Sequence, residues 1–327
     1  MILLLDTVGL TVGSRNSCFS IGKEEDTRLI SPKRVESILV TAKVSIDSSA
    51  LMLAFSYDVP LYYLDKQGAV TGVCRKASFN NASRIRRAQV WFEVHPDAVK
   101  WVKELLILKM QGYEMNLRYF RETVPSVMTG LESHIQALKS AQEKVREVAA
   151  RRLSDMEDYL RGLEGAAGRG YWAGLSDSLP ELYRFEERSR NPAQDAFNAA
   201  LNYLYGILYT KVEKAAYTVG MDPQLGIFHK DQYQKPALAF DLIEPFRCWA
   251  DRFLFDFLRQ EKPDKSFFRY TSAGVYLDKK GKACLIPEFI CYMEAKTTFN
   301  GRITSRDGHI MNFAGELARA LFNLEHP

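Results

Sequence analysis

A chain of 327 residues is long enough to bury a core and, at roughly 100 to 200 residues per domain, is more consistent with two domains than with one. Its 46% hydrophobic and 26% charged residues are ordinary for a folded globular protein and exclude collagen-like, solenoid and largely disordered chains. A net charge of +4 permits a polyanionic partner without requiring one. The sequence contains neither an apolar run of about 18 residues nor a signal-peptide pattern, so we expect a cytoplasmic protein without a membrane partner.

Short strand-like segments fill the first 80 residues. They are rich in β-branched or aromatic residues, are separated by turn-forming residues, and lie at 2–6, 10–13, 18–22, 27–31, 36–40 and 60–65. One helix interrupts them, because Asp47 or Ser48 can cap the apolar run 50–57 before Pro60 stops it. We therefore predict a small β-sandwich-like domain over residues 1–80.

Helical periodicity replaces this pattern from about residue 81 onward. Apolar residues recur every three or four positions, and the stretch 135–163 reads as one long amphipathic helix. The segment 262–290 reads as an insertion with possible short strands, and we assign it no role. The predicted fold class is α+β, with a larger all-α catalytic domain at residues 81–327.

Two isolated side chains are candidates for chemistry. Glu164 is followed by small residues at 165–168, which on a helix allow a ligand or another backbone to approach the carboxylate closely. A solvated glutamate beside a tight helix crossing explains the same residues. His229 follows a Gly- and Pro-marked segment and should lie on an irregular loop, where either a functional or a structural histidine is compatible with the pattern.

A pair of acids forms the third candidate. Asp241 and Glu244 stand three residues apart, so on a helix they share a face, and their neighbours are mostly apolar. Partly buried carboxylates need a cation, a partner or a proton. The partner could be Arg247, in which case the segment is a salt-bridged helix. Alternatively, two carboxylates and an imidazole suit Mg²⁺ or Mn²⁺ better than zinc, and the imidazole favours Mn²⁺.

These three segments, together with a helical segment at 195–208, resemble a known family in this order, the CRISPR-associated integrase of the spacer-adaptation machinery, which is CRISPR-associated protein one. The resemblance rests on the Leu-Glu-Gly run ending in Tyr-Trp, the DAFNAALNYLYGIL helix, the Gly-x-x-His loop and the Asp-Leu-x-Glu-Pro-Phe-Arg run, at 163–172, 195–208, 226–229 and 241–247. The strand-rich first quarter also looks like the amino-terminal β domain of that family.

The resemblance implies a site and a reaction. It places metal ligands at Glu164, His229 and Glu244, with Asp241 a nearby acid that assists or orients. The implied reaction is a metal-assisted attack by the 3′ hydroxyl of a DNA fragment on a phosphodiester at the edge of a CRISPR repeat; water in its place gives endonuclease activity. The implied partners are DNA, a second copy of the chain joined through the β domains, and a small second adaptation protein that bridges two dimers.

Basic residues predict where DNA could bind. Between Asp65 and Glu93 the sequence carries six basic residues and no acid, and three of the six are Arg84, Arg86 and Arg87. A second cluster beside aromatic residues contains Arg184, Arg188 and Arg190, and Arg247 adjoins the acid pair. Solvated helix faces and an ordinary loop are the alternatives.

The sequence is compatible with two other functions. A non-catalytic DNA-binding scaffold would use the same acids as structural salt bridges. A related transposon-borne integrase outside CRISPR immunity would keep the chemistry and change the biology.

Overall fold

The computed structural model describes most of the chain and divides it into two compact units, Met1–Phe79 and Asn80–Pro327. The residues that it describes are 1–23, 26–77, 82–124, 128–190, 192–229, 236–260 and 263–324. Within the described residues, no helix is both long enough and apolar enough to cross a membrane.

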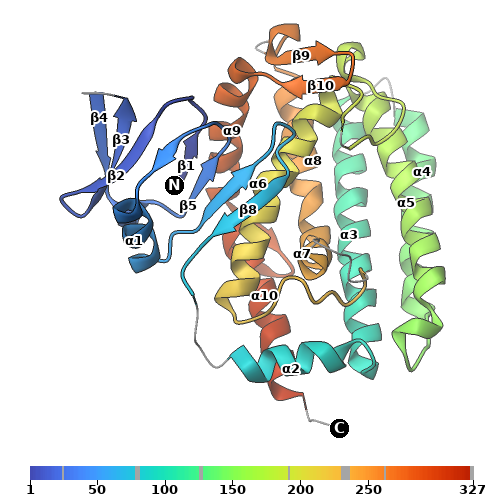
Figure 1. The fold of residues 1–327 in the computed structure, drawn as a ribbon. Coiled ribbons are helices and arrows are strands. Elements are labelled where there is room, and N and C mark those ends of the chain that lie inside the picture. Colours follow the sequence, from blue (N-terminus) through green and yellow to red (C-terminus); the bar gives the residue numbers. More distant parts are fainter. Residues whose placement is uncertain are drawn as a thin grey trace. The chain divides into compact units, whose positions relative to one another are not determined.

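In its described residues the first unit contains two four-stranded sheets, one α-helix and the 3₁₀ turn η1 (Pro32–Arg34) (Figure 1). One sheet has the order β1-β5-β7-β8 and the other the order β4-β3-β2-β6. The elements are β1 (Ile2–Leu5), β2 (Thr11–Arg15), β3 (Cys18–Lys23), β4 (Asp26–Ile30), β5 (Ser37–Val40), β6 (Ser45–Ile46), α1 (Ser48–Ser56), β7 (Leu61–Leu64) and β8 (Val70–Cys74). All six predicted strands are present, within one or two residues of the expected ends.

One apolar core joins both sheets of this unit. Leu5 and Ile38 come from the first sheet, Phe19 from the second and Ala54 from α1, and all are almost completely buried in one cluster. The side chain of Asp47 accepts a hydrogen bond from the N–H of Ala50 at 2.8 Å, so Asp47 rather than Ser48 caps the helix. The shared core makes the arrangement sandwich-like, while burial along the strands is uneven: β5 is buried throughout and β4 is largely exposed.

The second unit is predominantly helical, and the fold class predicted from the sequence is confirmed. Its helices are α2 (Ala82–Phe92), α3 (Pro96–Thr123), α4 (Met128–Glu147), α5 (Glu157–Ser178), α6 (Ala196–Thr218), α7 (Ala237–Ile243), α8 (Arg247–Leu258), α9 (Lys279–Glu294) and α10 (Arg306–Asn323). Short 3₁₀ turns are η3 (Leu153–Asp155), η4 (Glu181–Tyr183), η5 (Glu244–Phe246) and η6 (Lys265–Phe267). Two hairpins, β9 (Phe268–Thr271) with β10 (Gly274–Leu277) and β11 (Lys296–Phe299) with β12 (Arg302–Ser305), decorate the helices.

The prediction of one continuous helix over 135–163 is wrong. The chain leaves the helical conformation after Glu147, and α5 folds back to pack against α4. Val145 of α4 and Leu160 of α5 lie on opposite sides of the break, and both are completely buried. Apolar spacing cannot distinguish one helix from two antiparallel ones, because both arrangements bury the same residues.

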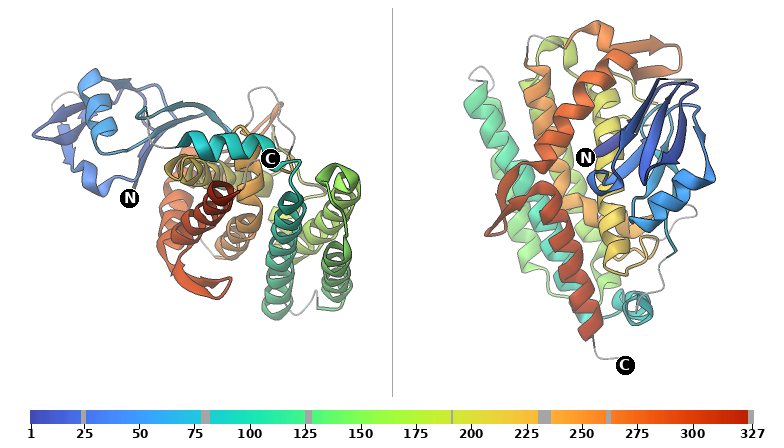
Figure 2. Two further views of the ribbon diagram at one scale, coloured as in Figure 1. Left: turned by 90° about the horizontal axis from the view of Figure 1, so that it is seen from below. Right: turned by 90° about the vertical axis from the view of Figure 1, so that its left-hand side faces the viewer.

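The helices of the second unit form two associated groups (Figures 1 and 2). Helices α3, α4 and α5 pack against one another, and α6 packs against α7, α8 and α10. The turn η5, which joins α7 to α8, contacts α3. This contact links the two groups and brings side chains of α3, α5 and η5 into one region.

Candidate active site

Helix α5 positions Glu164 two turns from its start, not near the end of a longer helix as the sequence suggested. The two glycines that follow the glutamate, Gly165 and Gly168, do not serve a helix crossing. A Cβ on Gly168 would meet nothing within 4 Å, whereas a Cβ on Gly174 would lie 2.8 Å from the side chain of Leu131. The tight crossing is therefore at Gly174, and the surface beside Glu164 is open to a ligand.

Asp241 holds the loop that carries His229. Its carboxylate accepts hydrogen bonds from the N–H groups of Ile227 (2.7 Å), Phe228 (3.1 Å) and His229 (2.9 Å). The Nδ1 of His229 lies 2.7 Å from Oδ1 of Asp241. Because a carboxylate at that distance favours a proton on Nδ1, Nε2 is left as the potential ligand atom.

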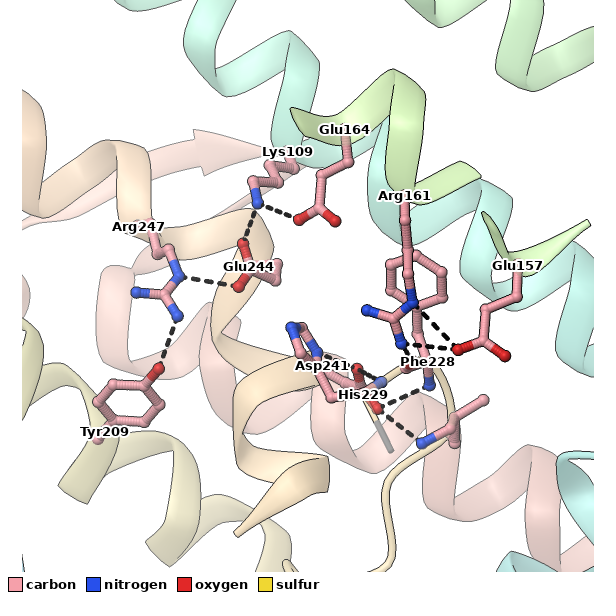
Figure 3. Close-up of polar contacts among 11 residues, drawn as sticks. Lys109, Glu157, Arg161, Glu164, Tyr209, Phe228, His229, Asp241, Glu244 and Arg247 are labelled. Carbon is pink, nitrogen blue, oxygen red and sulfur yellow. Dashed lines mark hydrogen bonds and ion pairs between the residues drawn. The ribbon is translucent and has the colours of Figure 1, made fainter. Parts of the chain in front are cut away.

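The prediction that His229 lies on an irregular loop is thereby confirmed. The loop also depends on Gly226, because a Cβ there would lie 2.1 Å from the carbonyl oxygen of His229. On its outer side, Arg161 of α5 donates to the carbonyl of Phe228 at 2.5 Å and to Glu157 at 2.8 Å (Figure 3).

Glu244 opens the turn η5 and lies between two cations. Its Oε1 is 3.0 Å from Nε of Arg247, and its Oε2 is 2.6 Å from Nζ of Lys109. The same Nζ is 2.5 Å from Oε1 of Glu164, so Lys109 bridges the two glutamates (Figure 3). Burial alone raises the pKa of Glu244, but the charges of Arg247 and Lys109 outweigh it and bring the pKa down to about 2.

The partner predicted for Glu244 is thus present. Arg247 pairs with Glu244 and also donates to the hydroxyl of Tyr209 at 2.6 Å. The two acids of the predicted pair have different roles. Asp241 holds the His229 loop through hydrogen bonds. Glu244 belongs to an ion-pair cluster with Lys109, Arg247 and Glu164.

The members of the ion-pair cluster and His229 line a cavity of about 840 Å³, whereas Asp241 lies behind its wall. Glu164, His229 and Glu244 all contribute to its wall, together with Lys109 and Arg247. Further basic groups in the wall are Arg161, Arg169, Arg188 and Arg190. A cavity of this size and charge can accept a segment of a phosphate-containing chain.

The cavity has donor groups suited to a divalent cation. Oε2 of Glu244 is buried and has no well-aligned hydrogen bond; its contact is the ion pair with Lys109. Within the described residues, however, no three His, Cys, Asp or Glu side chains stand close enough together to hold one metal ion. The residues fit a metal by chemical type and by the cavity that they share, and the ligand set stays a prediction.

A buried polar network lies behind the cavity. Asp251 is fully buried and accepts hydrogen bonds from the hydroxyls of Tyr205 (2.6 Å) and Tyr171 (2.9 Å). Asn116 of α3 donates to the same Tyr171 hydroxyl at 3.0 Å. Burial raises the pKa of Asp251 to about 6, although both tyrosine hydrogen bonds lower it. The ring of Tyr205 lies beneath Arg247, at 4.7 Å, so the network supports a wall of the cavity.

The predicted DNA-binding arginines are divided among several environments. Arg188, Arg190 and Arg247 line the cavity. Arg184 instead donates to the carbonyls of Leu179 and Asp177 at the end of α5, which is a structural role.

The other predicted cluster lies away from the cavity, on the exposed face of α2. Arg84, Arg86 and Arg87 are all exposed, and the guanidinium of Arg84 stacks 4.4 Å from the ring of Phe322. The other three basic residues between Asp65 and Glu93, which are Lys66, Arg75 and Lys76, belong to the first unit.

Lys109 was missed by the sequence argument, although a signal for it exists. It lies on the buried stripe of α3, in line with Leu105, Leu106 and Tyr113. A lysine at a core position is rarely buried unless it is paired, so this departure from the apolar pattern marks it as unusual.

The fold and the site together define a class of protein: a β unit followed by a helical unit whose cavity combines acids, an imidazole and many cations. The chain matches the family described as "CRISPR associated protein Cas1" over residues 3–290 and belongs to that family. The resemblance expected from the sequence is thereby confirmed.

Individual relatives agree with this assignment. The chain is 26% identical to CRISPR-associated endonuclease Cas1 1 of Thermodesulfovibrio yellowstonii, over 88% of each chain. It is 28% identical to CRISPR-associated endonuclease Cas1 1 of Archaeoglobus fulgidus, over 92% of this chain and 91% of the relative.

Two solved structures share the fold. A casposase bound to integration product superposes with a TM-score of 0.84 at 21% identity, covering 100% of this chain and 92% of the other. A Cas1 protein from Thermotoga maritima superposes with a TM-score of 0.80 at 19% identity, covering 99% of this chain and 98% of the other. The comparisons agree with the Cas1 integrase role predicted from the sequence and do not favour the scaffold or the transposon-borne alternative over it.

Proposed function

We propose that this Cas1 protein joins DNA fragments into a CRISPR array by metal-dependent transesterification at a phosphodiester, and that it cleaves DNA when water replaces the attacking hydroxyl. The observation that carries the proposal is the single cavity lined by Glu164, His229 and Glu244 and bordered by cations. Membership of the Cas1 family, whose curated relatives are named endonucleases, supports it.

Glu164, His229 and Glu244 would hold a Mg²⁺ or Mn²⁺ ion, which supplies Lewis-acid stabilisation of the phosphoryl oxygens when bound. Each side chain is held in a different way. Asp241 fixes His229 through Nδ1, Arg247 fixes Glu244, and α5 presents Glu164 beside the open surface of Gly168. Asp241 therefore acts as a positioning residue and not as a ligand.

In the proposed reaction, the 3′ oxygen of the fragment forms a new bond to phosphorus while the bond to the leaving 3′ oxygen of the repeat strand breaks. The proton of the attacking hydroxyl is lost and the leaving oxygen gains one, so the number of phosphodiesters is unchanged. Arg188, Arg190 and Arg247 would hold the phosphates that flank the reacting one.

The proposal is tested by Mn²⁺-dependent joining of a labelled DNA fragment into a plasmid that carries a CRISPR repeat. Glu164→Ala and His229→Ala should lose at least about a hundredfold in rate, because removing a ligand should cost no less than the roughly 10- to 100-fold cost of changing a ligand's hydrogen-bond partner. Glu181→Ala, which changes an exposed glutamate of η4, is the control and should join normally. Undiminished joining by the first two variants would exclude this site.

We further propose that the first unit mediates homodimerisation in the cytoplasm and that two dimers assemble on a small second adaptation protein. Exposed apolar side chains on the first unit, such as Val8 and Met52 (each 64% exposed), support a protein partner there. Light scattering of the full chain should give about 75 kDa, twice the chain mass of 37.3 kDa. A monomeric mass at micromolar concentration would contradict the dimer.

A further inference from the structure

Lys109 is the most unusual charged residue of the cavity. It lies on α3, is 8% exposed, and places its ammonium against two glutamates that come from α5 and η5. Three segments far apart in the sequence thus meet at one nitrogen atom. The proposed metal chemistry assigns no part to this lysine.

The ammonium uses the same oxygens that a metal ion would need. Arg247 takes Oε1 of Glu244, while Lys109 takes Oε2 of Glu244 and Oε1 of Glu164. A divalent cation that binds both glutamates must share this space with a positive group. Two cations at contact distance in a buried site repel strongly, so the ammonium and the metal exclude each other.

The ion-pair cluster is electrically balanced by its own side chains. Two carboxylates, Glu164 and Glu244, face two cations, Lys109 and Arg247. Without Lys109, the two acids would share one partially buried region with a single cation, which is unfavourable because buried charges need partners.

We infer that Lys109 is an internal counter-ion that holds Glu164 and Glu244 in place before the metal binds and is displaced when it binds. The inference rests on the proposed function. A lysine suits this role because its four-carbon stem is flexible, and the adjoining 840 Å³ cavity gives the ammonium room to move. Once displaced, Lys109 would remain in the cavity beside Arg247, and with a bound cation these groups would make the cavity strongly positive, which would favour a DNA phosphate.

If Lys109 competes with the metal ion, removing its charge should increase the affinity for the metal. Replacing Lys109 by methionine keeps the length and apolar stem of the side chain but removes the competing charge. Lys109→Met should therefore bind Mn²⁺ about tenfold more tightly than the wild type, or better. In metal-free buffer the same variant should unfold at a lower temperature, and Mn²⁺ should raise its Tm by more than it raises that of the wild type.

The measurements are calorimetric titration with Mn²⁺ and thermal unfolding with and without EDTA. Lys100→Met, which changes an exposed lysine of the same helix, is the matched control and should behave as the wild type. If Lys109→Met is too unstable to purify, Lys109→Gln removes the charge with a polar side chain and gives the same comparison.

The outcomes separate this inference from the proposed function. Unchanged or weaker Mn²⁺ binding by folded Lys109→Met would overturn the counter-ion role. Mn²⁺ binding that survives in Glu164→Ala would overturn the site assignment instead. If the wild type binds no Mn²⁺ but Lys109→Met does, the counter-ion role is supported; if neither binds, both proposals fail.

Discussion

Asp241 is completely buried, and its two oxygens accept hydrogen bonds from three consecutive backbone N–H groups. Its contact with Nδ1 of His229 fixes the orientation of the imidazole. An asparagine has the same shape but presents an NH₂ group to some of these donors, and an unmatched buried donor destabilises a loop.

Asp241→Asn should therefore weaken Mn²⁺ binding by about 10- to 100-fold, the range found when the partner of a metal-binding histidine is changed. The ¹⁵N chemical shifts of His229 should also report loss of the Nδ1–H tautomer, which a purely structural role would not predict. Asp222→Asn, which removes a carboxylate that caps the N–H of Gln224 at the start of the same loop, serves as the control. Normal tautomer and affinity in Asp241→Asn would refute the positioning role.

Individual site residues were predictable from their surroundings in the sequence to different degrees. His229 follows clear turn signals, and the pairing of Glu244 with Arg247 needs only three residues of separation. Lys109 pairs across 55 residues with Glu164, so the contact depends on how α3 and α5 pack. Periodicity gives the face of a helix but not the partner of that face.

At the scale of elements, α5 offers a matched pair of glycines. A Cβ added at Gly162 or at Gly168 would meet nothing within 4 Å, but only Gly168 lines the cavity. Alanine at either position should stabilise the helix by about 0.5–1 kcal/mol, because glycine loses more conformational entropy on folding.

The two substitutions should differ in DNA binding. We expect Gly168→Ala to weaken DNA affinity several-fold. The added methyl group would occupy part of the cavity beside Glu164, where the proposed function places the DNA backbone. Gly162→Ala should leave affinity unchanged. Thermal unfolding and fluorescence anisotropy with a labelled duplex provide the two readouts, and equal affinities for the two variants would show that the ligand does not approach this face.

Boundaries within the helical unit were less predictable than element types. The strand pattern of the first unit is local and appeared almost as expected, with Asp47 acting as the cap. The break between α4 and α5 lacks a proline or glycine, and the chain reverses there so that α5 packs against α4, with Val145 and Leu160 both completely buried. Local propensity cannot register such a reversal.

At the scale of the whole molecule, two buried acids should change the free energy of unfolding with pH in opposite directions. Glu244 has its pKa lowered to about 2, so its stabilising contribution is present above its ordinary value of 4.5 and is lost as the pH falls toward 2. Asp251 has its pKa raised to about 6, so its contribution is fully present below 3.8 and is lost as the pH rises through 6.

In the wild type, ionisation of Asp251 should lower the free energy of unfolding by roughly 3 kcal/mol between about pH 4 and 6, because each pKa unit corresponds to about 1.4 kcal/mol. Asp251→Asn has no carboxyl group to ionise at this position, so its free energy of unfolding should not show this decrease. The asparagine can still accept from one tyrosine hydroxyl and donate to the other, so the fold should survive. The measurement is urea denaturation of Asp251→Asn, the wild type and the exposed-site control Asp177→Asn at several pH values. All three proteins contain the same histidines, so a difference between their pH profiles reports the ionisation of Asp251. A pH profile of Asp251→Asn parallel to that of the wild type would mean that Asp251 stays ionised throughout this range, held so by Tyr171 and Tyr205.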